Sequence, residues 1–391
     1  MEKFKKVLLS LTPYAVGFTI GLLFIRFGAT TGETVGEYED VRRLFYILLP
    51  LLVLLVSLLV GLLLHIIIHE AGHLAAGRLS GYSFVSLRVG NLTIIREEDK
   101  LVRKKYGIAG ASGQCLMSPP DVADTQHKFP FIFYNLGGGL ANILFSIPLL
   151  IFSFLASGHI LSALLIFALI GIILGVVNII PMKISGIAND GLNIITCCKS
   201  LKNRRALWIQ LKFVALVTQG VRLCDMPQEW VEDIGVPTDA LTGFLASLRC
   251  CYLLEKGEIE QARDYAKSVI ENPGKMLELH KSELRCELLF CELIGECRAS
   301  EIEKLYTAKL RKHIKAHATH LPKHRLIFAY ERLYAKDEAK AYKALTNFER
   351  ACLHTPFKGE IAGERELVEL VKQTAELKRG IQCHPQNQDS T

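Results

Sequence analysis

Residues 44–79 read LFYILLPLLVLLVSLLVGLLLHIIIHEAGHLAAGRL, and this stretch decides both the fold and the chemistry expected of the chain. It ends in the pattern His-Glu-x-x-His, formed by His69, Glu70 and His73. On a helix, two histidines four residues apart lie one turn apart on the same face, where both imidazoles can bind one Zn²⁺. Glu70 follows the first histidine and is positioned to act as a general base on a water at the metal.

The same stretch is apolar enough to cross a membrane. Residues 44–68 form a run of 25 residues without a charge, and a bilayer span needs about 20. A carboxyl group in such a helix is costly, so Glu70 is expected to be functional. Without a metal, Glu70 and the two histidines would have no partner there, which favours a metal site over an accidental match to the pattern.

Charge is distributed unevenly along the 391 residues. Mean hydropathy is +0.27 although 22% of the residues are charged, because long uncharged runs precede residue 195 and charge is dense after residue 199. This segregation predicts a membrane half and a soluble half, each of ordinary domain size. The net charge of +7 is modest and spread over both halves, so nucleic-acid binding is not indicated.

The cysteines do not form a disulfide framework. There are 11 of them, none in a Cys-x-x-Cys pair, and most lie in apolar helical patterns. The odd number and the missing framework indicate a reducing compartment for the soluble half.

Four apolar runs are long enough to span a bilayer, namely residues 7–25, 44–79, 129–156 and 160–180. A cleaved signal peptide would resemble the first run, but its length and the Arg26 that follows favour a retained span. Lys and Arg are more numerous at the amino terminus and in residues 78–128 and 183–205 than on the opposite side. The positive-inside rule then predicts a multi-pass protein of the cell membrane, with both termini and the C-terminal region in the cytoplasm.

The polar segment 81–128 carries short β-like runs. Residues 84–89 and 92–95 are expected to pair with residues 101–105 across a turn at 97–100, which predicts a small β-hairpin. Residues 110–120 are rich in Gly, Ser and Pro and are expected to form a loop. Residues 201–221 are basic at first and apolar later, so they either form an interfacial amphipathic helix or begin the soluble domain.

The C-terminal region shows a helix-turn-helix pattern from residue 239. Residues 251–266 resemble the middle of a tetratricopeptide repeat, in which a turn, here with Gly257, joins two antiparallel helices. Residues 292–296 and 333–339 are weaker echoes, and their turns lie about 38 and 41 residues apart, near the repeat's period of about 34. A generic helical bundle is the alternative. We favour a tetratricopeptide-like domain, because spacing drifts in such arrays.

The expected fold is an all-α membrane protein, with about four transmembrane helices and a small β-hairpin, followed by a soluble α-helical, tetratricopeptide-like domain. Residues 1–200 form the predicted membrane domain, and residues 201–238 form a linker or interfacial helix. Residues 239–380 form the cytoplasmic helical domain, and residues 381–391 form a disordered tail.

A catalytic zinc site needs a third protein ligand, and Asp190 is the best candidate. Asn189-Asp190-Gly191 is also a common turn sequence, which is the plainer interpretation. However, Asp190 follows the fourth span near the level of the histidines, where unwound backbone is tolerated only beside protein or a water-filled cavity. His65 lies one turn before His69 and is either an alternative ligand or a supporting neighbour of the site. We favour the supporting role.

Three pieces of the membrane half resemble the site-2 protease family of intramembrane zinc metalloproteases. They are HEAGH at 69–73, GGLAN at 138–142, and NIIP at 178–181 followed by Asp190 and Gly191. They are similar to the family's His-Glu-x-x-His, Gly-Pro-x-x-Asn and Asn-x-x-Pro…Asp-Gly elements. The match covers about two-fifths of the chain, roughly residues 44–193.

The resemblance implies a role for each matched residue. By position, His69, His73 and Asp190 would bind one Zn²⁺, and Glu70 would activate the attacking water. The resemblance also implies residues that bond the substrate backbone or stabilise the oxyanion, namely Asn142 and Asn178.

The sequence departs from the family pattern in several places. Gly139 stands where the family has Pro, Asn189 stands where Leu is usual, and the gap from Pro181 to Asp190 is about one helical turn longer. The glycines at 137–139 also fit plain helix packing, since small residues let transmembrane helices approach closely. No stretch resembles a PDZ or CBS module, and the tetratricopeptide-like domain would replace them.

We therefore expect a zinc-dependent endopeptidase that hydrolyses peptide bonds in or near transmembrane segments, in regulated intramembrane proteolysis or peptide-precursor processing. Its partners would be a transmembrane protein or peptide-precursor substrate, and a cytoplasmic protein or peptide at the helical domain. The alternative is a non-catalytic membrane receptor with a structural zinc site, which would not need Glu70. A metal transporter would need polar residues along its spans, and residues 7–25 and 160–180 offer almost none.

Overall fold

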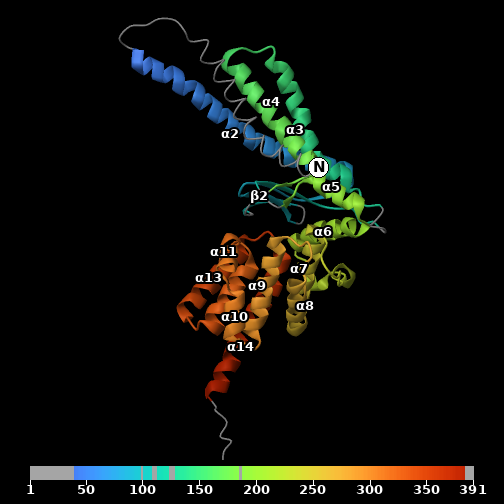
Figure 1. Cartoon of the computed structure of the whole chain (residues 1–391), viewed down its shortest axis with the longest axis vertical. Coiled ribbons are helices and arrows are strands. Elements are labelled where there is room, and N and C mark those ends of the chain that lie inside the picture. The colour runs from blue at the N-terminus through green and yellow to red at the C-terminus, as the bar shows by residue number, and fades with distance from the viewer. Residues whose placement is uncertain (1–38, 98–99, 108–111, 123–127, 185–186, 384–391) are drawn as a thin grey trace, which may run out of the picture. The chain divides into compact units, whose positions relative to one another are not determined.

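The computed structural model describes residues 39–97, 100–107, 112–122, 128–184 and 187–383. These residues are mostly helical, with a small antiparallel sheet (Figure 1). The chain divides into two compact units. One combines the chain up to Ala76 with Ile132–Ile195, and the other combines Gly77–Phe131 with the chain from Thr196 onward. The domain limits expected at residues 200 and 238 stay predictions.

The first unit contains three long apolar helices, α2 (Glu39–Leu79), α3 (Phe131–Ser153) and α4 (Gly158–Ile179). Each is long and apolar enough to cross a membrane, over Leu48–Leu79, Phe131–Ser153 and Ile160–Ile179. This confirms the second, third and fourth apolar runs as helices. The run expected at residues 7–25 lies outside the described residues.

The surface of α2 supports a membrane environment. Leu52, Leu55 and Leu59 each expose more than half of their side chain. A row of exposed leucines on one helix is unfavourable in water, whereas lipid chains solvate it. The exposed leucines of α2 are therefore consistent with a membrane environment.

Glycines bring the three membrane helices into close contact. A Cβ atom added at Gly72 of α2 would lie 2.3 Å from the carbonyl oxygen of Gly137 on α3. A Cβ atom at Gly175 of α4 would lie 2.7 Å from the carbonyl oxygen of Gly139 on α3. These backbone contacts confirm the packing interpretation for Gly137 and Gly139, because no larger residue fits at either interface.

The polar segment after α2 forms a four-stranded sheet rather than a hairpin. Its strands are β1 (Ser83–Val89), β2 (Leu92–Glu97), β3 (Lys100–Lys105) and β4 (Gly113–Ser118), in the order β3-β2-β1-β4. The pairing of β2 with β3 is confirmed, with Ile95 opposite Val102. The expected pairing of residues 84–89 with 101–105 was wrong, because β2 lies between β1 and β3. The prediction of a loop at 110–120 was wrong, because residues 113–118 form strand β4, which pairs with β1. Cys115 and Met117 alternate with less buried neighbours and give this strand one buried face.

A short connection leads from α4 to the second unit. Strands β5 (Lys183–Ile184) and β6 (Ile187–Ala188) form a small hairpin, followed by α5 (Asp190–Lys199) and α6 (Leu201–Gln219). Trp208 of α6 is buried and donates its indole N–H to the carbonyl of Pro120, at 3.1 Å. Helix α6 thus packs beside the end of β4. Two short 3₁₀ turns follow, at Leu223–Asp225 and Gln228–Trp230.

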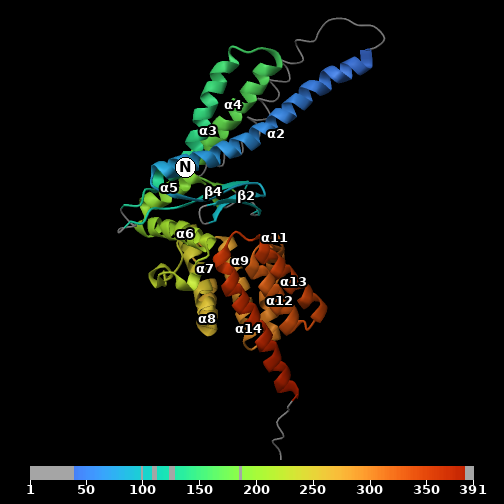
Figure 2. The ribbon, with the colours of Figure 1, turned by 180° about the vertical axis from the view of Figure 1, so that it is seen from behind.

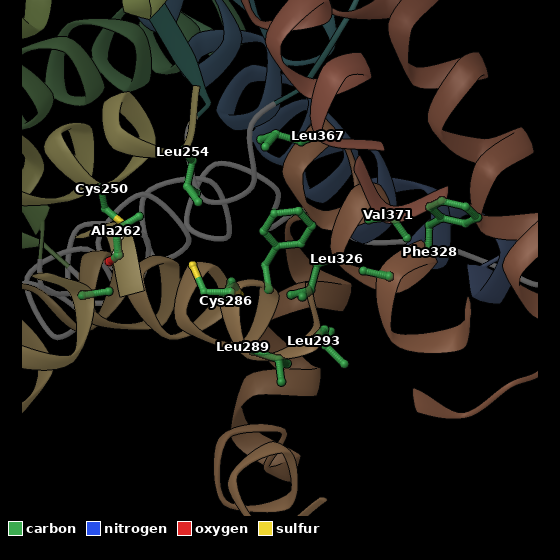
Figure 3. Close-up of a cluster of buried hydrophobic side chains, with 14 of the residues drawn as sticks. Cys250, Leu254, Ala262, Cys286, Leu289, Leu293, Leu326, Phe328, Leu367 and Val371 are labelled. Carbon is green, nitrogen blue, oxygen red and sulfur yellow. Dashed lines mark hydrogen bonds between the residues drawn. The ribbon is translucent and has the colours of Figure 1, made fainter. Parts of the chain in front are cut away.

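Eight helices follow as the C-terminal region (Figure 2). They are α7 (Ala240–Glu255), α8 (Ile259–Glu271), α9 (Glu278–Ile294), α10 (Ala299–Leu305), α11 (Ala308–Ala316), α12 (Leu321–Ala329), α13 (Glu338–His354) and α14 (Lys358–Cys383), with the π-helical turn Tyr330–Tyr334 after α12. Figure 3 shows their shared apolar core, to which α7, α8, α9, α12 and α14 contribute side chains. This core confirms a helical C-terminal region.

The three turns expected from the sequence share one backbone feature. A residue in the left-handed conformation lies within the first and third of these turns, namely Gly257 and Lys336, and directly after the second, namely Cys297, with φ values of 77°, 55° and 56°. Such a residue ends a helix and reverses the chain. Left-handed residues thus recur along the region, and Gly274, with a φ of 50°, is another one between the first two turns.

The helical core also encloses charged side chains. Arg325 is 1% exposed and donates to Glu364 and Glu287, both at 2.7 Å. Its guanidinium also lies 3.9 Å from the ring centre of Phe290. Because each buried charge has a partner, the arrangement is stable, but the removal of Arg325 would leave two buried carboxylates without their cation.

We predict that Arg325→Met lowers the free energy of unfolding by about 3–5 kcal/mol, the usual cost of a buried charge that loses its partner. Chemical denaturation of the full chain in mild detergent measures this value. Arg365→Met is the matched control, since the Arg365–Glu349 pair is about half exposed on both sides. It should cost about 0–1 kcal/mol, and equal losses for the two variants would contradict the prediction.

A second prediction concerns Glu360 of α14. Burial, followed by the nearby carboxylates of Glu364, Glu255 and Glu283, raises the pKa of Glu360 to about 8. An unfolded glutamate has a pKa of about 4.3, so the folded chain holds this proton more tightly. The resulting stability is complete below about pH 4 and is lost as pH rises through about 8.

Glu360→Gln removes this titration, so the variant should be more stable than the wild type at pH 9 by about 1–3 kcal/mol. The two proteins should converge toward pH 5. Thermal unfolding between pH 5 and pH 9 provides the measurement, with the exposed Glu376→Gln as control. A pH dependence that Glu360→Gln leaves unaltered would exclude this role.

Candidate metal centre

Three side chains from two distant parts of the chain meet in the first unit, which contains α2, α3 and α4 and is called the membrane unit below. The Nε2 atoms of His69 and His73 lie 3.1 Å apart. Oδ2 of Asp190 lies 3.3 Å from Nε2 of His69 and 3.4 Å from Nε2 of His73. The three atoms therefore form a nearly equilateral triangle that joins α2 to the start of α5.

The size of this triangle suits a bound metal ion. Nitrogen and oxygen ligands that bind a tetrahedral metal at about 2.0–2.2 Å lie roughly 3.3–3.6 Å from one another. The sides of the triangle are close to these values, and Oδ2 of Asp190 has no hydrogen-bond donor among the described residues. The group can hold a metal ion, as expected for His69, His73 and Asp190.

The charge on Asp190 is suited to the same role. Burial alone would raise the pKa of the Asp190 carboxyl, but in the metal-free chain its contacts with the His69 and His73 rings in their protonated form outweigh burial and hold that pKa well below its usual range. A carboxyl group with a lowered pKa is an anion at neutral pH, and an anionic oxygen is the form that binds a cation.

Helix α3 orients the histidines from the side. Nδ1 of His73 donates to the carbonyl of Tyr134 at 2.8 Å, which leaves Nε2 as the lone-pair nitrogen for a metal. A Cβ atom at Gly138 would lie 2.5 Å from Cε1 of His69 and 2.6 Å from Nε2 of His73. Only glycine therefore lets α3 approach the two ligands this closely. Nδ1 of His69 is buried, with no hydrogen-bond partner among the described residues.

Asn189 fixes the position of Asp190. Its amide donates to the carbonyls of Val177 and Ile180 at the end of α4, at 2.6 and 2.7 Å. Its Oδ1 accepts from the backbone N–H of Leu192 at 2.9 Å, which caps the first turn of α5. The Asn189 side chain thus bonds backbone groups at the end of α4 and at the start of α5. These bonds hold Asp190 where the two helices meet.

In the sequence, Asn189 departs from the family pattern and belongs to a common turn sequence. Its capping role was missed, although an Asn directly before a helix is a recognisable signal. The same residue explains why the longer gap after Pro181 does no harm. Asn189 forms two hydrogen bonds with Met182, of 3.0 and 3.1 Å. The residues between them include the β5–β6 hairpin, so the longer gap does not move Asp190 away from the end of α4.

Gly191 completes this junction. A Cβ atom there would lie 2.0 Å from the carbonyl oxygen of Ile179. The start of α5 can therefore pack on the end of α4 only with glycine at this position. This contact accounts for the Asp-Gly pair in steric terms.

Glu70 lies on α2 between the two histidines in sequence. It is buried, with 7% of its surface exposed, and it interacts electrostatically with His73. A carboxylate can act as a general base, and the catalytic role expected of Glu70 stays a prediction.

The other predicted site residues are placed differently. Asn142 is fully buried, and its Oδ1 lies 3.3 Å from Nδ1 of His65. Asn178 donates to the carbonyl of Leu174 in its own helix, at 3.0 Å. Both substrate-binding roles stay predictions. His65 is absent from the ligand triangle, because its second nitrogen contacts the carbonyl of Phe167 at 2.8 Å.

A second group in the C-terminal helices, formed by Glu283, His313 and His317, has a similar composition. Its geometry is that of an ordinary polar network. Glu283 accepts from Lys323, and the His313 ring nitrogen lies 2.8 Å from the other Glu283 oxygen, a normal hydrogen-bond distance. Because a buried lysine already neutralises Glu283, this group has no need of a cation.

Comparisons of the chain with protein-family models, curated proteins and solved structures found no match. The resemblance to the site-2 proteases therefore rests on the residues themselves.

The two candidate groups give a direct prediction. Asp190→Ala should weaken metal binding by roughly 100-fold or more, since it removes a ligand outright. Glu283→Gln should leave the metal content unchanged, because that group is satisfied by Lys323. Elemental analysis of the purified full chain after dialysis measures both. Loss of metal in Glu283→Gln but not in Asp190→Ala would reverse the assignment.

Proposed function

We propose that the protein is a zinc-dependent intramembrane endopeptidase of the site-2 protease type. One observation carries the proposal. Two of the three candidate metal-binding atoms, from His69 and His73, lie on a helix apolar enough to cross a membrane, and Asp190 brings the third from the start of α5, with the buried carboxyl group of Glu70 nearby. A peptide-bond hydrolase that acts within a membrane needs this combination, because its substrate, its metal and its base must meet away from bulk water.

The donor set favours zinc among the common metals. Two imidazoles and one carboxylate form a three-ligand set of the kind found at catalytic zinc sites, which keep the fourth position open. Zn²⁺ held by His69, His73 and Asp190 would supply a Lewis acid for the scissile carbonyl and would lower the pKa of a water molecule.

The remaining steps belong to side chains of this chain. Glu70 would accept a proton from the attacking water and would deliver it to the leaving amine as the peptide bond breaks. The carbonyl of Tyr134 holds His73 in the tautomer that a ligand needs. Asn142 and Asn178 would contact the substrate backbone, as the family resemblance implies.

The substrate class follows from the surroundings of the site. A transmembrane helix hides its carbonyls in backbone hydrogen bonds, so it must unwind locally before attack. Substrates are therefore membrane proteins or peptide precursors with helix-weakening residues near the cleaved bond. Their products serve regulated proteolysis or peptide maturation.

The membrane topology is part of the proposal. A fourth span at residues 7–25, together with the three apolar helices, would place both termini on one side. The excess of Lys and Arg in residues 78–128 and 183–205 supports the cytoplasm as that side. The C-terminal helices would then meet cytoplasmic partners.

We also propose that the C-terminal helices form a tetratricopeptide-like domain that recruits or gates the substrate. The left-handed residues at Gly257, Cys297 and Lys336 support a repeated helix-turn-helix unit. Arrays of such units present extended surfaces to peptides or proteins.

We predict that Glu70→Gln keeps the metal but lowers cleavage by about 10²–10⁴-fold, since the amide cannot take the proton. Membrane-bound peptides from cells with the wild type and with Glu70→Gln would be compared by mass spectrometry. The substrate should accumulate uncleaved in the variant. Identical peptide patterns with an unaltered biological output would instead favour a receptor with a structural metal.

A further inference from the structure

A third histidine of α2, His65, lies one turn before the first ligand His69. It is fully buried, and each of its ring nitrogens faces an oxygen atom. Nε2 lies 2.8 Å from the backbone carbonyl of Phe167 on α4, and Nδ1 lies 3.3 Å from Oδ1 of Asn142 on α3. His65 therefore joins all three membrane helices one turn away from the metal ligands.

The contact with Phe167 determines which nitrogen of His65 carries the proton. A backbone carbonyl can only accept a hydrogen bond, so the proton must be on Nε2. A neutral imidazole has only one N–H, which makes Nδ1 an acceptor.

The amide of Asn142 must match this tautomer. With Oδ1 toward Nδ1 of His65, two acceptors face each other, and Nδ2 of Asn142 is buried without a partner among the described residues. A half-turn of the amide corrects both defects, because the NH₂ group then donates to His65. The amide oxygen then takes the position that Nδ2 held, on the side of the amide that faces away from His65.

The imidazole is held too tightly to turn instead. A Cβ atom at Gly171 of α4 would lie 2.1 Å from Cε1 of His65, so the helix backbone closes directly over the ring. The ring of Phe145 packs edge-on against His65, with ring centres 6.0 Å apart. Ser146 donates to the backbone carbonyl of Asn142 and does not compete for its side chain.

We propose that His65 is a positioning residue that makes Asn142 offer its amide oxygen, and not its NH₂ group, to the peptide substrate. This inference rests on the proposed function and decides between the two roles considered for Asn142. An amide oxygen accepts a backbone N–H from an unwound substrate, whereas it cannot stabilise a negatively charged oxyanion.

The placement of Asn142 supports contact with the substrate. Gly138 lies one turn earlier on the same face of α3, and this face meets Nε2 of both His69 and His73. Asn142 is therefore the first polar side chain after Gly138 along α3. Because Asn142 has no exposed surface in this structure, its contact with a peptide would require neighbouring side chains to move aside.

The tautomer can be tested without any substrate. The full chain, labelled with ¹⁵N-histidine and placed in lipid bilayers, would be studied by solid-state NMR. The signal missing from His65→Gln identifies His65, and this variant keeps an amide N–H for Phe167. We expect a neutral ring with the proton on Nε2 and a bare Nδ1 that changes in Asn142→Leu. A proton on Nδ1, or a doubly protonated ring, would overturn the proposal.

Kinetics with the peptide that accumulates in Glu70→Gln membranes tests the role of the amide oxygen. Loss of an acceptor for the ground-state backbone raises KM with little effect on kcat, whereas loss of an oxyanion donor lowers kcat about 10²–10³-fold. We expect Asn142→Leu and His65→Gln each to raise KM about tenfold or more, with kcat within about twofold. Ser57→Ala, at another buried polar residue of α2, is the control and should alter neither constant.

The outcomes separate this inference from the proposed function. A lower kcat with unaltered KM in Asn142→Leu overturns the inference, although the wild type would still be a peptidase. A wild type that binds metal but cleaves nothing overturns the proposed function, and the NMR result then still decides the tautomer of His65. Metal content measured for each variant shows whether the site remains folded.

Discussion

The carboxylate of Asp190 meets the imidazoles of His69 and His73 at 3.3 and 3.4 Å, and much of the membrane unit supports this meeting. The two histidines need only a helix, because four residues make about one turn. Asp190 needs more, since it follows a different helix after a loop. Asn189 fixes the position of Asp190, because its side chain donates to carbonyls at the end of α4 and accepts from the first turn of α5. The extra residues of the longer gap form the β5–β6 hairpin.

Close helix packing is the second condition for the site. Lipid gives little hydrophobic drive to bring helices together, so close contact depends on small residues and polar links. Gly72, Gly137 and Gly139 let the backbones touch, and Gly138 leaves room for the two imidazoles. His73 and His65 add links from α2 to the carbonyls of Tyr134 and Phe167. The same contacts that hold the helices together thus orient the chemistry.

The C-terminal region is stabilised by the burial of apolar side chains. Its helices share a buried apolar core of the kind that water drives together. Arg325 sits within that core between two carboxylates, and Lys323 neutralises Glu283. These charges are tolerated because each has a partner. The contrast with the ligand triangle is informative, since Oδ2 of Asp190 has no such donor among the described residues.

The sequence by itself determined the features that depend on local periodicity. An uncharged run made α2 a membrane helix, four-residue spacing put His69 and His73 on one face, and alternation predicted the β2–β3 pair. Only the tertiary structure decided the rest. The hydrogen bonds from Asn189 to the end of α4, the pairing of β4 with β1 and the link from His65 to Phe167 all join residues distant in the chain. Local spacing carries no information on such contacts, because they depend on how separate elements pack.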